Sequence, residues 1–171
     1  MGTEKALLAV VALVALGLAG TALGASDTSA QTVTITVEEI AQLSVTGNPG
    51  TLTLASAATT PGSLPPAVTD ATTSLSWTSN VAATTRKITA ALDSSYTAGV
   101  VLKATLTEPG GTNGTTTGQQ TLTDTATDML TGVTNENCTG ATITFEASLS
   151  TMIAPIASES RTLTWTLTAE Q

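Results

Sequence analysis

The sequence has no histidine and only one cysteine, Cys138, among its 171 residues. Without histidine, Ser-His-Asp and Cys-His nucleophile systems, histidine-based zinc sites and imidazole bases are all excluded. Because a lone cysteine cannot close an intramolecular disulfide, an exported chain of this kind must be stabilised by packing or by assembly. The composition therefore predicts no enzyme of these classes, and we expect no catalytic residue and no cofactor.

Positively charged residues are also few. Five Lys and Arg residues oppose thirteen Asp and Glu residues, which gives a net charge of −8. Beyond Lys5, the basic residues are scattered singly or in one pair along the chain: Arg86, Lys87, Lys103 and Arg161. Nucleic-acid binding requires a cationic stripe, and anionic membranes repel an acidic surface. We therefore expect neither nucleic acid nor a lipid surface as a partner of the mature chain.

Threonine, in contrast, is abundant, with 39 copies in the chain. Its β-branched side chain suits a pleated surface that is wet on one face, so the composition favours strands over helices. The length fits one ordinary domain, since domains cluster around ~100 to 150 residues. We expect a single all-β domain.

The N-terminus has the features of an export signal. Residues 6–24 form an uncharged run rich in Ala, Leu and Val, and Lys5 precedes it. We therefore predict a signal peptide over residues 1–24, with a mature start at Ala25 or, from a second small-residue site, at Gln31. The alternative is a retained transmembrane anchor, for which the run is nearly long enough. Export implies an extracellular or cell-surface location.

The mature chain, residues 25–171, alternates apolar and polar residues in short runs. The period of two predicts strands at residues 32–37, 52–54, 75–77, 88–92, 100–106, 141–149 and 163–167, with weaker signals at 43–45 and near 122. Gly, Pro and Asn clusters separate these runs. The pattern predicts an antiparallel β-sandwich, immunoglobulin-like or jelly-roll-like, of about eight or nine strands. At most one helical turn is expected, at Thr127–Leu130.

Clustered acidic and amide residues suggest two kinds of site, and both are better explained structurally. Asp124 and Asp128, followed by Asn135, Glu136 and Asn137, offer oxygen ligands of the kind calcium accepts, but their spacing matches no calcium loop. Turn and cap roles account for them better, so we predict no metal site. A carboxylate pair for glycoside hydrolysis would have to come from acids such as Glu38, Glu39, Asp93 or Glu146. Glu38 and Glu146 fall on the polar faces of their expected strands, so solvated faces explain these two.

We expect the tryptophans and the cysteine to serve packing and not binding or catalysis. Trp77 and Trp165 are in phase with leucines on their own strands, which favours core packing over a sugar-stacking platform. Tyr96 is the only aromatic residue in an expected loop. Cys138 is expected to be a small buried hydrophobe, with intermolecular bridging as the alternative.

Two sequons for N-glycosylation are present. They are Asn113-Gly114-Thr115 and Asn137-Cys138-Thr139. A threonine-rich chain contains such triplets by chance, so they matter only in a cell that glycosylates exported proteins. Asn113 and Asn137 are therefore candidate glycosylation sites.

The first strand, residues 31–38, lies close behind the predicted cleavage site. It is strongly β-prone and uncharged before Glu38, and after cleavage it would have a free end. Such a strand can pair with its own sheet or with the open edge of a neighbouring subunit. In the second case Val33, Ile35 and Val37 would be the anchors donated to the neighbour, and the chain would form a homopolymer.

A resemblance supports this expectation. The signal, the stretch Ala25-Ser26-Asp27-Thr28-Ser29, the alternating strand and the threonine-rich sandwich look like the secreted biofilm-fibre and camelysin-like subunits. The chain is similar also to archaeal bundling pilins. The resemblance implies a β-sandwich whose subunits are joined by donor-strand complementation, and hence a structural subunit of an extracellular filament or pilus.

Two other functions stay open at this point. In the first, the protein is a monomeric surface module that binds glycans or contributes to a cell-envelope layer, and the first strand pairs within its own sheet. In the second, it is a hydrolase that brings two carboxylates together in a cleft. The filament subunit is the function that the sequence favours.

Overall fold

The structure of the protein is a computed structural model that describes residues 29–55, 59–81, 84–110 and 114–170. The predicted signal peptide and the cleavage site before Ala25 lie outside the described residues. The chain divides into two units, Met1–Val37 and Glu38–Gln171. We call the second unit the sandwich domain, and we call residues 29–37, the described part of the first unit, the N-terminal segment.

The sandwich domain is built of strands, and the described residues contain no helix. The strands are β1 (Ala41–Thr46), β2 (Val68–Ser79), β3 (Arg86–Leu92), β4 (Val100–Thr107), β5 (Thr115–Thr116), β6 (Gln120–Thr121), β7 (Thr127–Val133), β8 (Glu136–Leu149) and β9 (Leu163–Ala169). All of their pairings are antiparallel. The expectation of an all-β chain is confirmed.

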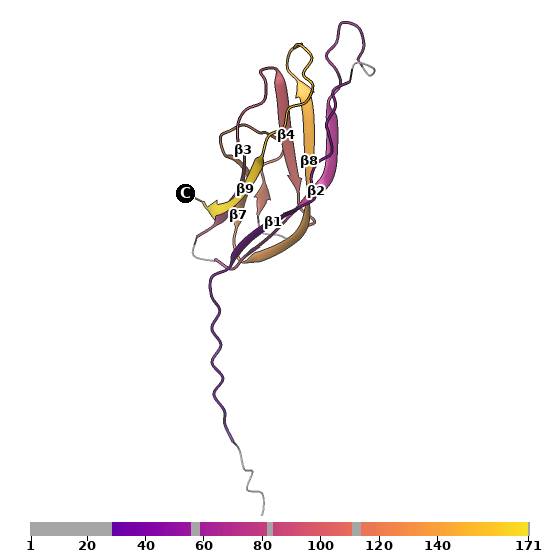
Figure 1. The fold of residues 1–171 in the computed structure, drawn as a ribbon. Helices are drawn as coiled ribbons and strands as arrows, with labels where there is room; N and C mark the ends of the chain where they lie inside the picture. Colours follow the sequence, from indigo (N-terminus) through magenta and orange to yellow (C-terminus); the bar gives the residue numbers. More distant parts are fainter. Residues whose placement is uncertain (1–28, 56–58, 82–83, 111–113, 171) are drawn as a thin grey trace, which may run out of the picture. The chain divides into compact units, whose positions relative to one another are not determined.

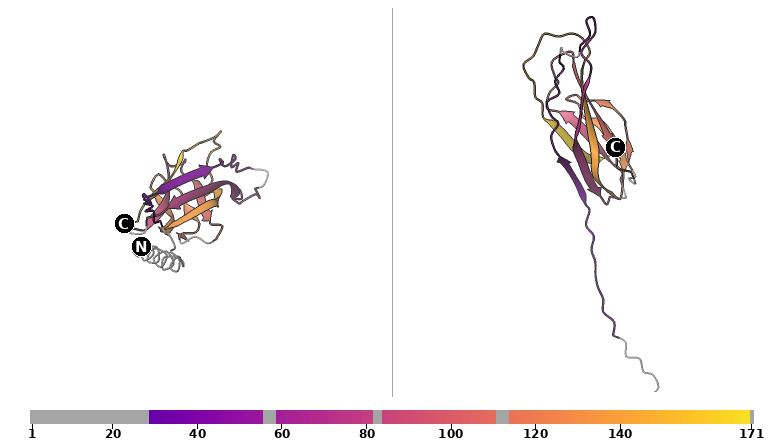
Figure 2. Two further views of the ribbon diagram at one scale, coloured as in Figure 1. Left: turned by 90° about the horizontal axis from the view of Figure 1, so that it is seen from below. Right: turned by 90° about the vertical axis from the view of Figure 1, so that its right-hand side faces the viewer.

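The strands form two sheets. One has five strands in the order β1-β2-β8-β4-β6, and the other has four in the order β5-β7-β3-β9. The sheets form two layers, as in a β-sandwich (Figures 1 and 2). Because strands distant in sequence, such as β2 and β8, are neighbours in one sheet, the order reflects tertiary pairing and not a simple meander.

The core lies where the apolar faces of both sheets meet. The long central strands β2 and β8 contribute Leu75, Trp77, Ile143 and Phe145, and each of these side chains is at most 3% exposed. Ile88 of β3 is fully buried on the facing sheet. The intervening Thr and Ser residues lie on the outer faces, as the period of two requires. Burial of each large side chain stabilises the fold by about 1.5–3 kcal/mol.

Two loop positions of the sandwich domain require glycine, because the main chain there has a positive φ. Gly47 follows β1 with φ +85°, and a Cβ there would lie 2.9 Å from the carbonyl oxygen of Thr72. Gly99 precedes β4 with φ +101°, and a Cβ there would lie 2.5 Å from the side chain of Ile153. Any other residue would meet both an unfavourable backbone conformation and a steric clash at these positions.

Two predicted strands do not form, and strand β7 was not predicted. Residues 127–130, where at most one helical turn was expected, begin strand β7, because they pair with β3. Residues 52–54 are in no strand, although Leu52 packs against the core. Residues 32–37 also belong to no strand. At residues 32–37 and 52–54 apolar and polar residues alternate as in a strand, but no described strand pairs with them.

The described part of the chain contains no helix that is long and apolar enough to cross a membrane.

Candidate functional site

The N-terminal segment carries the three most exposed large apolar side chains among the described residues. Val33, Ile35 and Val37 are 72%, 81% and 76% exposed, and Thr32, Thr34 and Thr36 alternate with them. In an extended chain this alternation would place the three apolar side chains on one face. Clustered exposed apolar side chains commonly mark an interaction site.

The first residues of the sandwich domain, 38–40, are held by the side chain of Asn80. Its Nδ2 donates a hydrogen bond to the carbonyl oxygen of Glu38 at 2.6 Å, and its Oδ1 accepts one from the amide of Ile40 at 2.6 Å. The main-chain amide of Asn80 also donates to the carbonyl oxygen of Ile40 at 3.1 Å. One asparagine therefore fixes the main chain just before β1.

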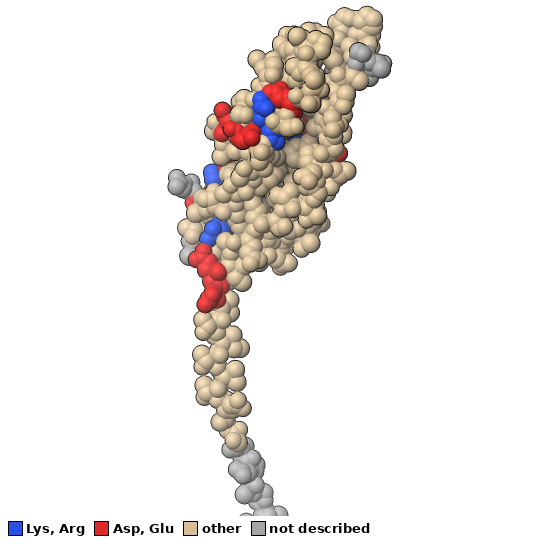
Figure 3. Space-filling model, viewed as in Figure 1, with Lys and Arg blue, Asp and Glu red and all other residues tan. Residues whose placement is uncertain are grey.

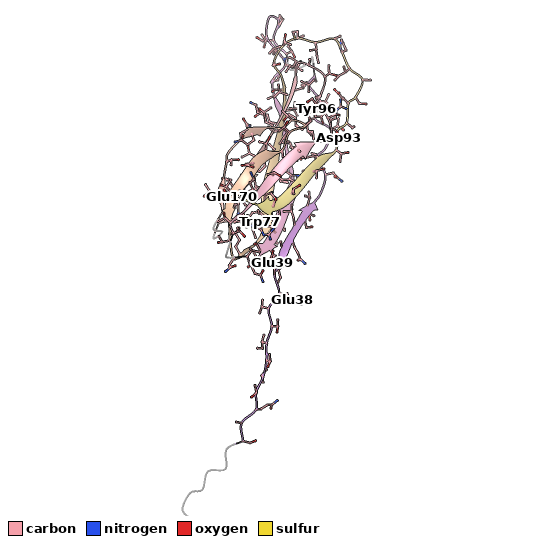
Figure 4. The ribbon with its side chains drawn as sticks, turned by 90° about the vertical axis from the view of Figure 1, so that its left-hand side faces the viewer. Glu38, Glu39, Trp77, Asp93, Tyr96 and Glu170 are labelled. Atoms are coloured by element: carbon pink, nitrogen blue, oxygen red, sulfur yellow. The ribbon has the colours of Figure 1, made fainter. Side chains whose placement is uncertain are left out.

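An ion pair ties the same residues to the second sheet. Arg86 of β3 donates from Nη2 to Oε1 of Glu39 at 2.5 Å. Glu39 is two-thirds exposed, whereas Arg86 is largely covered. Figure 4 shows Glu39 toward the end of the domain at which β1 begins, and Tyr96 toward the opposite end. Sequence reasoning singled out neither Asn80 nor Arg86, because their role depends on tertiary contacts.

The sheets end in four edge strands of very unequal length. β5 and β6 contain two residues each, whereas β1 contains six and β9 contains seven. Short edges offer little backbone for another strand to pair with. The two long edges are therefore the places at which a further strand could be added to the sandwich domain.

The inward-facing residues of β9 are only partly covered. Leu163, Trp165 and Leu167 pack against the core and are half-buried, whereas the alternate residues Thr164 and Thr166 are exposed. The prediction that Trp165 packs in the core is thus confirmed only in part. Trp77 is buried as predicted, and its Nε1 donates a hydrogen bond to Oε1 of Glu136 at 2.6 Å.

The four basic side chains of the sandwich domain are all paired with carboxylates. The pairs are Arg86–Glu39, Lys87–Asp128 (2.9 Å), Lys103–Glu146 (3.4 Å) and Arg161–Glu159. On the face shown in Figure 3, basic atoms lie directly beside acidic ones. This arrangement neutralises the few cations locally, so it builds no cationic stripe among the described residues.

Two of the acidic candidates from the sequence are engaged by basic or amide side chains. Asp128 pairs with Lys87, and Glu146 accepts hydrogen bonds from Lys103 and Gln119. Among the residues that the structure describes, no group of three or more His, Cys, Asp or Glu side chains could hold a metal ion. That the protein is not an enzyme stays a prediction.

Tyr96 and Cys138 occupy different environments. Arg161 lies over the ring of Tyr96, 5.3 Å from its centroid, and also donates a hydrogen bond to the carbonyl oxygen of Ser95. Partial burial raises the pKa of Tyr96, and the charge of Arg161 opposes that rise. Cys138 is only 4% exposed, and burial raises the pKa of its thiol. A buried thiol of raised pKa reacts slowly, so Cys138 suits packing better than bridging.

A shallow hollow lies over β1, β2 and β8. It has a volume of about 530 Å³, and no charged side chain lines it. Hydroxyl and amide groups make up much of the lining, among them Gln42, Ser44, Ser76, Thr78 and Thr139. Such a surface can donate and accept hydrogen bonds, but the one tryptophan that lines it, Trp77, is buried in the core.

The two sequons differ in what the structure describes. Asn137 is exposed and lies in β8, where it pairs with Thr78 of β2. Asn113 lies outside the described residues. Exposure of Asn137 leaves its side chain accessible to a modifying enzyme, and its glycosylation stays a prediction.

Comparison of the chain with protein-family models, with curated proteins and with solved structures finds no match.

Proposed function

We propose that the protein is a structural subunit of an extracellular filament and that each subunit donates residues 31–38 to a second copy of the chain. The observation that carries the proposal is the state of the N-terminal segment. It has the composition and alternation of a strand, yet it belongs to no strand, and Val33, Ile35 and Val37 are exposed. A second copy can supply the sheet that these residues lack.

The energetics favour such an exchange. Burying a valine or isoleucine side chain stabilises an interface by about 1.5–3 kcal/mol, and part of that gain offsets the entropy of ordering the segment. Pairing would also satisfy the main-chain groups of the segment in a ladder. The single buried cysteine forms no disulfide that could stabilise the subunit. Binding of the donated strand of a second copy would stabilise the accepting sandwich domain instead.

The geometry of donation leads to a filament. The donated segment and the accepting edge are different surfaces of the chain, so the contact is head-to-tail. A head-to-tail contact that does not close into a ring continues indefinitely. Secretion through a signal peptide at residues 1–24, an immunoglobulin-like or jelly-roll-like strand connection, and kinship with biofilm-fibre subunits and bundling pilins all belong to this proposal.

The first test changes the central anchor. Ile35→Asp places a carboxylate where the proposal requires burial, and an unpaired buried charge is very costly. We expect export to continue and filaments to vanish from electron micrographs. Thr34→Asp is the matched control, because it adds the same charge to the other face of the segment and should retain filaments. Normal filaments from the Ile35→Asp variant would contradict the proposal.

The hollow over β1, β2 and β8 favours a second candidate function, a monomeric surface module that binds uncharged glycans. Its hydroxyl-rich lining suits a neutral polyol, although no exposed aromatic ring lines it for stacking. Binding of the purified monomer to a glycan array, lost in a Ser76→Leu variant that blocks the hollow, would support this function. Absence of binding by a well-folded monomer would remove it.

A further inference from the structure

The main chain of β9 shows which of its residues face the open edge of the four-stranded sheet. Two hydrogen bonds flank its ladder with β3: Asp93 donates to the carbonyl oxygen of Thr162 at 2.9 Å, and Glu170 donates to that of Thr85 at 2.9 Å. Bonded pairs alternate along an antiparallel ladder. Counting inward from either end, Thr164, Thr166 and Thr168 exchange hydrogen bonds with β3.

The remaining residues of β9 direct their main-chain groups away from β3. They are Leu163, Trp165, Leu167 and Ala169, and their N–H and C=O groups face the edge at which β9 pairs with no strand among the described residues. Unpaired N–H and C=O groups in a row are a template for another strand. The open edge therefore offers a regular set of donors and acceptors.

The same residues carry the incompletely covered side chains. Leu167, Trp165 and Leu163 pair with Ile88, Ala90 and Leu92 of β3. The β3 side chains are 0%, 0% and 5% exposed, whereas their β9 partners are only half-buried. Burial thus decreases from β3 to β9, as expected for a sheet face that lacks one further strand.

The other long edge is a weaker template. On β1, the hydrogen bond between Asn80 and the carbonyl oxygen of Ile40 sets the same alternation, so Ala41, Leu43 and Val45 face its open edge. These side chains are smaller than those of β9, and only Leu43 is packed against the core. The sheet of β1 already has five strands, whereas the sheet of β9 has four.

β9 also lacks the features that protect natural edge strands. Exposed edges are usually guarded by lysine, by proline or by a bulge. The sequence of β9 contains no charged residue and no proline, and its ladder with β3 runs without a register shift. Residues 31–37 likewise contain neither charge nor proline. Neither stretch carries a guard against pairing.

We propose that the open edge of β9 accepts residues 31–37 of a second copy of this chain, an inference that rests on the proposed function. Donor and acceptor are seven residues each. Val33, Ile35 and Val37 would extend the inward row formed by Leu163, Trp165 and Leu167. The threonines of the two strands would lie side by side on the outer face, and the sheet would gain its fifth strand.

A pair of proline variants tests the choice of edge. Ala169→Pro removes an N–H that points to the open edge of β9, and Ala41→Pro does the same for β1. Both alanines are exposed, and neither amide takes part in the ladder of its own sheet, so both variants should fold. We expect Ala169→Pro to reduce the yield of filament about tenfold or more, as loss of a main-chain bond and steric blocking predict. Ala41→Pro should leave the yield unchanged.

A crosslinking experiment on the full chain locates the contact directly. Thr34 is replaced by the photoreactive amino acid benzoylphenylalanine, assembled filaments are irradiated, and the crosslinked dimer is mapped by mass spectrometry. Crosslinks to residues 163–169 support the inference. Filaments whose crosslinks map to β1, or normal assembly of Ala169→Pro, overturn it and leave the proposed function intact. Failure of the unmodified chain to assemble at all overturns both.

Discussion

Two stretches of this chain have nearly the same sequence and very different surroundings. Residues 32–37 read Thr-Val-Thr-Ile-Thr-Val, and residues 162–167 read Thr-Leu-Thr-Trp-Thr-Leu. The second stretch forms most of β9, where β3 supplies its hydrogen bonds and its apolar residues are half-buried. The first belongs to no strand, and its apolar residues are exposed. Alternation with β-branched residues creates an apolar face, but burial of that face requires a partner strand.

The largest effect should come from making one substitution in both environments. Ile143 is fully buried in β8, whereas Ile35 is 81% exposed. We expect Ile143→Ala to lower the free energy of unfolding of the monomer by about 2–5 kcal/mol, through lost burial and a cavity. Ile35→Ala should change it by less than about 0.5 kcal/mol, as for an exposed site. Urea denaturation of both variants measures the difference, and equal losses would show that Ile35 is buried in the monomer.

The two tryptophans should differ from each other less than the two isoleucines do, because Trp165 is already half-buried in the monomer. Trp77 is 2% exposed, and Trp165 is half-buried at the open edge. We expect Trp77→Ala to destabilise the monomer by about 3–5 kcal/mol and Trp165→Ala by clearly less. In assembled material the loss at Trp165 should grow, because the donated strand would cover it. Thermal melts of monomer and assembly compare the two, and an unchanged loss at Trp165 would argue against its burial on assembly.

The smallest effect is expected at the ion pair that ties residues 38–40 to β3. Glu39 is two-thirds exposed, so solvent screens its attraction to Arg86. We expect Glu39→Gln to lower the free energy of unfolding by at most about 1 kcal/mol, and we expect that difference to shrink as salt is added. Denaturation at low and high salt measures it. A loss that salt does not change would point to a role in packing and not in charge pairing.

The period of two was sufficient to predict most of the fold. It located the cores of β2, β3, β4, β8 and β9 and the antiparallel, all-β class, because those strands alternate regularly between a buried and a solvated face. It did not predict the strand that begins at residues 127–130, because a register shift in β7 interrupts the alternation. Two-residue strands such as β5 leave no periodic signal at all.

The candidate site was predicted only on its donor side. Val33, Ile35 and Val37 stand out in the sequence, because apolar residues alternate with threonine there without interruption. The accepting edge did not stand out, since the sequence of β9 resembles that of any half-buried strand. Its place at the end of a four-stranded sheet depends on the order of pairing, which the local pattern does not encode. Asn80 was missed for the same reason, because its partners lie some forty residues away.

Amide hydrogen exchange of residues 32–37, followed by mass spectrometry in the monomer and in assembled material, tests directly whether a second copy of the chain supplies the missing partner strand. We expect exchange within seconds in the monomer, since these amides belong to no ladder, and strong protection in the assembly. Protection that is already complete in the monomer, or exchange that is equally fast in filaments, would contradict the claim that a second copy of the chain supplies the missing partner strand.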